Sequence, residues 1–88
     1  MYFTYVLYSE SADRIYVGYS HDPEKRLWYH NEGLAFATKP YRPWILIYSK
    51  PFAERSQAMR HEKELKTHSG RTWIRDHLLK DGVRQRPD

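Results

Sequence analysis

Two runs of β-branched and aromatic residues near the N-terminus predict a pair of neighbouring strands. The runs cover residues 2–8 and 14–19, and the polar residues 9–13 between them suit a hairpin loop, so we expect antiparallel strands. A period of two divides the first run into Phe3, Tyr5 and Leu7 on one face and Thr4, Val6 and Tyr8 on the other. Because both faces are largely apolar, we expect helices to cover at least one of them.

A glycine interrupts the second strand. Tyr16 and Gly18 share one face of this strand, opposite Ile15, Val17 and Tyr19. Glycine weakens a strand and often marks the close approach of another group. We therefore expect Gly18 to form the floor of a site beside Tyr16.

The residues after the second strand predict a helix start. Asp22 or His21 can cap the helix, and Pro23 suits its first position, where a missing N–H costs nothing. Arg26 and His30 follow at i and i+4, on the edge of the buried stripe. Taken singly they fit a solvated charge and a packed histidine, but as a pair facing the tyrosines of the sheet they also fit a functional site.

A loop and a third strand come next. Residues 34–43 are irregular and contain two prolines, which indicates an ordered crossing loop. Lys39 and Arg42 in this loop can contact either phosphates or water. The apolar run 44–48 is long enough for a strand and too short for a helix, and we expect Pro51 to break it.

A second helix is predicted from about residue 53 to residue 66. On a wheel of about 100° per residue, Ala58, Glu62 and Leu65 fall within about 60° of one another, which places Glu62 in the apolar stripe. An ionised carboxylate on a buried face is costly unless it is paired or metal-bound. Glu62 is therefore either the partner of an arginine such as Arg26 or a cation ligand, whereas Glu64 points into solvent.

A third helix is predicted from Ser69 or Gly70 to about residue 80. Its inward residues are expected to be Ile74, His77 and Leu78, and its outward pair Arg71 and Arg75. We expect one domain over residues 1–82 and a flexible tail over residues 83–88.

The composition fits a small soluble domain with one modest core. The chain has no cysteine, which excludes disulfides and thiolate metal sites and fits a reducing compartment. No apolar run reaches the length of a membrane span, so we expect a cytoplasmic protein. Fifteen Lys and Arg against eleven Asp and Glu give a formal charge of +4, a mild bias toward a polyanionic partner.

Several familiar catalytic motifs are absent. His61 and Glu62 begin like a zinc-protease helix, but Leu65 stands where that chemistry needs a second histidine. The four glycines form no phosphate loop, and no glycine pattern supports a serine nucleophile.

The remaining polar set offers proton acceptors, a fixed cation and a single carboxylate. Its members are Tyr5, Tyr16, Arg26, His30 and Glu62. Phosphodiester hydrolysis needs an activated water, a counter-charge for the phosphorane and a stabilised leaving group, and this set suits those needs. A tyrosine acts as the base only if nearby cations lower its pKa. One carboxylate with waters and phosphate oxygens is the usual ligand set for Mg²⁺ and a poor one for zinc.

In these residues the sequence resembles the GIY-YIG nuclease superfamily. It is most similar to small stand-alone members that resemble the N-terminal catalytic domain of the bacterial excision-repair nuclease subunit. The elements that match, in order over about residues 2–80, are Thr4-Tyr5-Val6, Tyr16-Val17-Gly18, Arg26, the stretch His30-Asn31-Glu32-Gly33, Thr38, Pro43-Trp44 and residues 58–66. Two positions depart from the pattern: Thr4 replaces a glycine, and Tyr19 stands where excision-repair nucleases tend to have lysine.

The resemblance implies an α+β fold, with a three-stranded antiparallel sheet flanked by three helices, and DNA cleavage that depends on Mg²⁺ or Mn²⁺. By position, Tyr5 and Tyr16 are the two signature tyrosines, either of which can be the general base. The resemblance makes Arg26 the contact to the scissile phosphate, His30 a residue that orients the base, and Glu62 the metal ligand. Nucleic-acid contacts are expected from Gly18, Lys39, Arg42, Arg71 and Arg75.

Three functions stay open on the sequence alone. The first is a metal-dependent endonuclease that acts on branched or damaged DNA in repair or recombination. The second is a nucleic-acid-binding module with little turnover, since 88 residues leave no room for a separate recognition domain. The third, a structural interaction domain, requires all five site residues to be coincidental. We expect a monomer in each case.

Overall fold

Three antiparallel strands form one sheet in the order β2–β1–β3, so the first strand lies at its centre. The computed structural model describes residues 1–83, with side chains to residue 79. Its elements are β1 (Tyr2–Ser9), β2 (Arg14–Ser20), α1 (Pro23–Asn31), a 3₁₀ helix (Lys39–Tyr41), β3 (Ile45–Phe52), α2 (Arg55–Lys66), α3 (His68–Ile74) and a π-helical segment (Arg75–Val83). The predicted fold class is confirmed, while the predicted tail lies outside the described residues except for residue 83.

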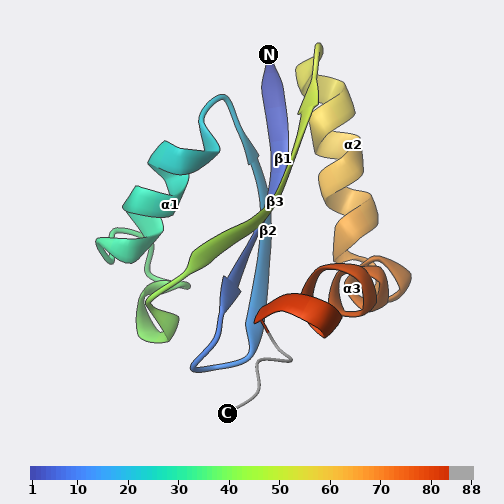
Figure 1. The fold of residues 1–88 in the computed structure, drawn as a ribbon. Helices are drawn as coiled ribbons and strands as arrows, with labels where there is room; N and C mark the ends of the chain where they lie inside the picture. The colour runs from blue at the N-terminus through green and yellow to red at the C-terminus, as the bar shows by residue number, and fades with distance from the viewer. Residues whose placement is uncertain (84–88) are drawn as a thin grey trace.

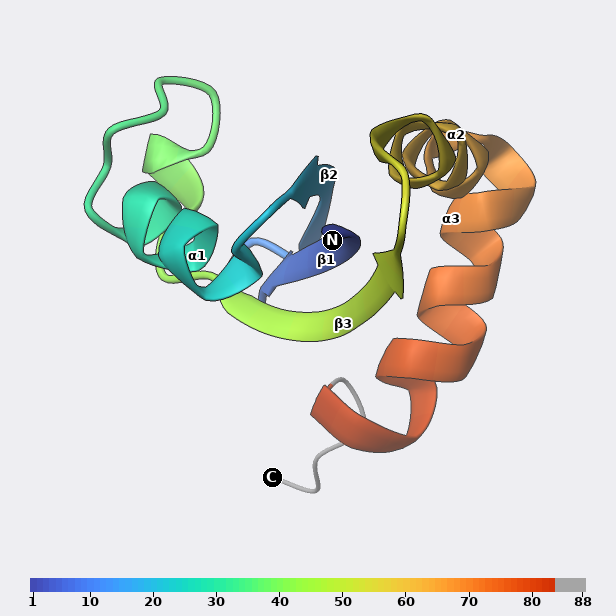
Figure 2. The same ribbon diagram turned by 90° about the horizontal axis from the view of Figure 1, so that it is seen from above.

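The helices cover both faces of the sheet (Figure 1). Helix α1 lies on one face and α2 and α3 lie on the other, as the view from above also shows (Figure 2). The side chains of β1 divide as predicted, because Tyr5 and Leu7 pack on the α1 side with Trp44, whereas Val6 and Tyr8 join the core under α2 and α3. No helix within residues 1–83 is long and apolar enough to cross a lipid bilayer.

The hairpin of β1 and β2 has the predicted antiparallel pairing. Tyr5 lies opposite Gly18, and Leu7 lies opposite Tyr16. This register places both tyrosine side chains on the face that α1 covers, because residues two apart along a strand share a face.

The third strand is longer than predicted and runs through Pro51 to Phe52. The expectation that Pro51 breaks it is wrong. Strand β3 pairs with β1 alone, so it is an edge strand, where the missing N–H of a proline can face solvent without loss of a ladder bond. The prediction failed because sequence pattern does not reveal which strand lies at an edge.

Thr4 attaches α2 to the central strand. Its side chain is fully buried, and Oγ1 donates a hydrogen bond of 2.8 Å to the carbonyl oxygen of Ala58. Ala58 precedes Glu62 by four residues, about one helical turn. The threonine that replaces the motif glycine therefore fixes the turn of α2 that carries Glu62.

The third helix departs from its predicted course. It begins at His68, where the hydroxyl of Thr67 caps it by accepting a hydrogen bond from the Gly70 N–H at 3.1 Å. The wider turn of the following π-helix rotates later side chains away from α-helical spacing. His77, predicted to face inward, is exposed and stacks on Trp73.

Candidate active site

Two tyrosines from neighbouring strands lie beside Gly18. The ring centroids of Tyr5 and Tyr16 are 6.4 Å apart. A Cβ atom at position 18 would lie only 2.7 Å from the hydroxyl oxygen of Tyr5 and 3.3 Å from Cε2 of Tyr16. A side chain there would displace the Tyr5 phenol, so Gly18 forms the floor on which this phenol rests.

Helix α1 places Arg26 against Tyr5. Of the two predicted caps, the side chain of Asp22 rather than His21 caps the helix. The Arg26 guanidinium interacts with the Tyr5 hydroxyl, and its central carbon lies 4.3 Å from the centroid of the Tyr29 ring, one turn along the helix. The cation is therefore held between a phenol oxygen and an aromatic face.

The two partners perturb each other electrostatically. Burial raises the pKa of Tyr5 above its ordinary value, and this effect exceeds the lowering that comes from the hydrogen bond and charge of Arg26. Burial by itself would lower the pKa of Arg26, but the hydrogen bond to Tyr5 and the nearby phenols raise it overall. Because a guanidinium only donates, the Tyr5 oxygen is the acceptor in this interaction. The raised pKa keeps the Tyr5 phenol protonated.

His30 is buried and satisfied at one nitrogen. Its Nδ1 lies 2.8 Å from Oγ1 of Thr38, and the Thr38 hydroxyl donates to the Ala35 carbonyl oxygen at 3.4 Å. The bond to Ala35 favours Thr38 as the acceptor of a proton on Nδ1, an arrangement that leaves the lone pair on Nε2. Nε2 is buried and has no hydrogen-bond partner among the described residues.

Aromatic neighbours hold Tyr16 in place. Its ring centroid lies 4.7 Å from that of His30 and 6.3 Å from that of Trp44. Trp44 is fixed in turn by Asn31, which donates to its carbonyl oxygen at 2.9 Å and accepts from its N–H at 2.6 Å. Nε1 of Trp44 also donates to the Thr38 carbonyl oxygen at 3.0 Å. The loop that supports His30 thus supports Tyr16 as well.

Glu62 lies on α2 and is paired with a lysine. Its Oε2 is 3.0 Å from Nζ of Lys66, one turn later, so its ion-pair partner is this lysine and not Arg26, the arginine that the sequence suggested. The Glu62 side chain is 17% exposed and that of Lys66 is 47% exposed. Such a partly exposed pair contributes little to stability, so a metal cation can displace the lysine. The charge of Glu62 also helps to raise the pKa of Tyr5.

The side chains that could bind a metal ion suit Mg²⁺ or Mn²⁺ better than zinc. The part of the chain with described side chains gathers no three His, Cys, Asp or Glu residues into a cluster. A structural zinc site needs four such ligands, whereas Mg²⁺ binds through one or two carboxylates with waters and substrate phosphates. Glu62 therefore fits Mg²⁺ or Mn²⁺ as a single protein ligand.

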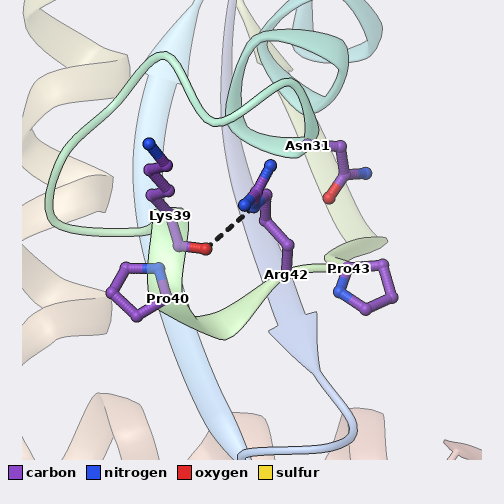
Figure 3. A pocket seen from close by; sticks show the side chains of 5 residues that line it. All are labelled: Asn31, Lys39, Pro40, Arg42 and Pro43. Atoms are coloured by element: carbon purple, nitrogen blue, oxygen red, sulfur yellow. Dashed lines mark hydrogen bonds between the residues drawn. The ribbon is translucent and has the colours of Figure 1, made fainter.

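Two predicted nucleic-acid contacts line one cavity of about 520 Å³ (Figure 3). Lys39 and Arg42 lie on it together with Asn31 and two prolines, and Nε of Arg42 donates to the Lys39 carbonyl oxygen at 2.9 Å. Within the residues whose side chains are described, neither cation forms an ion pair. Their charges are therefore available to an anion.

The other two predicted arginine contacts lie in the opposite layer. Arg71 belongs to α3, and its Nε donates to the Lys66 carbonyl oxygen at 3.3 Å. Arg75 follows α3, and its guanidinium bonds the side chain and carbonyl oxygen of Asp13 at 2.9 and 3.0 Å. Because α3 covers the face of the sheet away from α1, the structure does not bring these arginines to the two tyrosines (Figure 2).

Comparison with known proteins identifies the family. The family model described as the GIY-YIG catalytic domain matches residues 1–76. This chain belongs to the GIY-YIG catalytic-domain family. Among relatives, the UPF0213 protein of Staphylococcus haemolyticus is 45% identical over 56 residues, covering 62% of this chain and 68% of the relative. A UPF0213 protein of Staphylococcus aureus strain Mu3 is 32% identical over 81 residues, covering 91% and 95%. No solved structure matches.

Membership of the GIY-YIG family implies nuclease chemistry, and one departure from its pattern now has a structural context. This departure is Tyr19, at the end of β2. Its hydroxyl accepts a 3.0 Å hydrogen bond from Nη2 of Arg55, whose guanidinium carbon lies 5.7 Å from the Tyr19 ring centroid. A cation is therefore still present at the end of β2, although it comes from α2 and not from the strand itself.

Sequence reasoning missed the residues that hold the GIY-YIG side chains in position. Tyr29 had a usable signal, because it stands three residues after Arg26 on the same helix. Thr38 was identified only as a position that matches the family pattern. Its contact with His30 had no signal, because the irregular loop between the two residues follows no periodic pattern.

The environment of His30 predicts an altered titration. Burial, and to a smaller extent the charge of Arg26, lower the pKa of His30 below its ordinary value. The unfolded chain then takes up the proton first, so this contribution to stability is present above about pH 6.5 and is lost as pH falls through the folded pKa. NMR titration should show the Nδ1–H tautomer and a pKa below about 6.5. Thr38→Val should remove the tautomer preference, and Thr38→Ser should retain it. A wild-type His30 pKa at or above the ordinary value would contradict the expected lowering.

Proposed function

We propose that this protein is a DNA endonuclease that hydrolyses phosphodiester bonds with the help of Mg²⁺ or Mn²⁺. The observation that carries the proposal is the convergence of four polar side chains on the α1 face of the sheet, namely Tyr5, Tyr16, Arg26 and His30. They come from three elements, β1, β2 and α1, and their positions depend on the tertiary fold. Branched or damaged DNA is the proposed substrate.

Arg26 has the properties of a phosphate-binding residue. It is permanently charged, its head is held by Tyr5 and Tyr29, and it forms no ion pair among the described side chains. A guanidinium fixed in advance stabilises the charge that develops on a pentacovalent phosphorane without reorganising at the moment of reaction.

The surroundings of the tyrosines favour Tyr16 as the general base. Tyr5 is 1% exposed and has a raised pKa, so it stays protonated and serves as a donor that orients the phosphate or the water. Tyr16 is partly exposed, packs against the His30 ring and lies within the electrostatic reach of Arg26. In the proposed step, the Tyr16 phenol gives its proton to solvent, the charge of Arg26 stabilises the phenolate, and the phenolate then removes a proton from the attacking water.

Glu62 is the residue that would hold the metal ion. When bound, Mg²⁺ or Mn²⁺ neutralises charge on the phosphate and stabilises the leaving oxygen. The bond from Thr4 to Ala58 holds the turn of α2 that carries this carboxylate, and the weak pair with Lys66 leaves it open to exchange.

Removing the Glu62 carboxylate should separate catalysis from binding. We expect Glu62→Ala to lower cleavage of flapped, branched and nicked DNA by at least about 100-fold in Mg²⁺, because the metal loses its protein ligand. EDTA should abolish wild-type cleavage, and DNA affinity measured by fluorescence anisotropy should change little.

Glu64→Ala is the matched control, because Glu64 lies on the same helix with a side chain that is 62% exposed. It should cleave like wild type. Equal nicking by Glu62→Ala and wild type would contradict the proposal and indicate a contaminating nuclease.

The two tyrosines should differ when each hydroxyl is removed. Tyr16→Phe is expected to lower kcat by about 10²- to 10⁴-fold, the usual contribution of a general base. Tyr5→Phe should cost less, because it removes an orienting hydroxyl and a bond to Arg26 while the base remains. Single-turnover cleavage rates measure both effects, and a larger loss in Tyr5→Phe would reverse the assignment.

The cavity cations should govern affinity rather than chemistry. The double substitution Lys39→Ala/Arg42→Ala should weaken binding and reduce the slope of log K against log salt by about two, while kcat at saturating DNA stays near wild type. A charge-matched control, Arg60→Ala/Lys63→Ala on the exposed side of α2, should change the slope less. Equal slopes for the two double variants would show that the cavity makes no local phosphate contact.

Arg71 and Arg75 are proposed phosphate contacts on the opposite layer of the protein. The Arg75 guanidinium is already bonded to Asp13.

The ion pair of Glu62 with Lys66 also supports a second candidate function, a nucleic-acid-binding module with little turnover. This candidate is favoured if the wild-type protein binds DNA but never cleaves it in Mg²⁺ or Mn²⁺.

A further inference from the structure

A second cavity, of about 350 Å³, opens beside Arg26, at the junction between the end of β2 and α1. It is lined by residues from the end of β2 and the first two turns of α1, among them Lys25, Arg26, Trp28 and Tyr29. We call it the Trp28 pocket. It adjoins the proposed active site, because Arg26 lines the pocket and also interacts with Tyr5.

The indole in this pocket is free for stacking. Trp28 is 57% exposed, although tryptophan is among the side chains that gain most from burial. The neighbouring Tyr29 ring is covered by the Arg26 guanidinium at 4.3 Å, whereas no ring stacks on Trp28 among the described side chains. The pocket therefore offers an unoccupied aromatic face beside two cations, Lys25 and Arg26.

This combination matches the chemistry of a nucleotide. A base has a flat π-face that stacks on an aromatic side chain, and its phosphate is attracted to nearby cations. The volume lies at the lower end of small-molecule pockets, which suits one base rather than a stretch of strand. A base inside a paired duplex is stacked and cannot enter, so the pocket selects a nucleotide that is already unpaired.

We propose that the Trp28 pocket binds the base of one unpaired nucleotide next to the phosphate held by Arg26. The inference rests on the proposed function and specifies its substrate class: DNA that carries an unpaired nucleotide at the cleavage point, as at a flap, an overhang or a bubble. Trp28 supplies the stacking face, and Lys25 and Arg26 receive the adjoining phosphates.

Binding measured without metal tests this proposal. Two labelled DNAs of equal length, one fully paired and one with a single-stranded arm, are titrated in EDTA and followed by anisotropy. Trp28→Ala should weaken binding of the armed DNA by about tenfold and leave binding of the paired DNA within about twofold. Trp28→Phe should keep most of the affinity, because the smaller ring still stacks.

Phe36→Ala is the matched control, because Phe36 is 93% exposed and lies outside the pocket. It should bind both DNAs like wild type. In a second measurement, 2-aminopurine at the junction of the armed DNA should be quenched by wild type and less by Trp28→Ala. This readout and Trp28→Phe keep the test decisive if the alanine variant folds poorly.

Three outcomes would overturn the inference: an equal loss on both DNAs, no loss on the armed DNA, or a change in sedimentation with unchanged DNA binding, which would make Trp28 a contact between two copies of the chain. The proposed function fails separately. If the wild-type protein prefers armed DNA but never cleaves it, the nuclease function is rejected and the nucleotide pocket is supported. If the wild-type protein cleaves DNA but Trp28→Ala binds like wild type, only the nucleotide pocket is rejected.

Discussion

The pairing of Tyr5 with Gly18 across the central hairpin is the constraint on which the site depends. The Tyr5 phenol has room only because the residue opposite carries no side chain. In that place it meets Arg26 from α1 and shares a face with Tyr16. A register slip of one residue would turn both tyrosines to the other side of the sheet, away from the arginine.

Strand β1 coordinates the two layers of the protein because it is buried on both faces. One face presents Tyr5 to α1, and the other presents Thr4 to the carbonyl oxygen of Ala58 in α2. The hairpin thereby sets the position of the phosphate-binding arginine and of the helix that carries Glu62. Two helices that are far apart in the sequence are aligned through neighbouring residues of a single strand.

Several polar groups of the site can form hydrogen bonds or ion pairs that the folded chain itself does not provide. Among the residues with described side chains, Nε2 of His30 is buried without a hydrogen-bond partner, the Tyr5 phenol is held neutral in a desolvated position, and the ion-pair partner of Glu62 is a partly exposed lysine. Each such group costs stability in the free protein. A site of this kind gains interactions when a phosphate and water enter it. Polar groups that lower the stability of the free protein are therefore found at functional positions.

Local patterns in the sequence determined the three strands, the faces of β1, the start of α1 near Asp22 and the family signature, because period-two alternation and capping act over a few residues. The choice of Asp22 over His21 as the cap came from the structure. The tertiary structure alone decided that Pro51 continues an edge strand and that Glu62 pairs with Lys66 rather than Arg26. It also decided that Thr38 contacts Nδ1 of His30 and that Trp28 stays exposed beside Arg26. These outcomes depend on which element packs against which, and a helical wheel or a strand period describes one element without its neighbours.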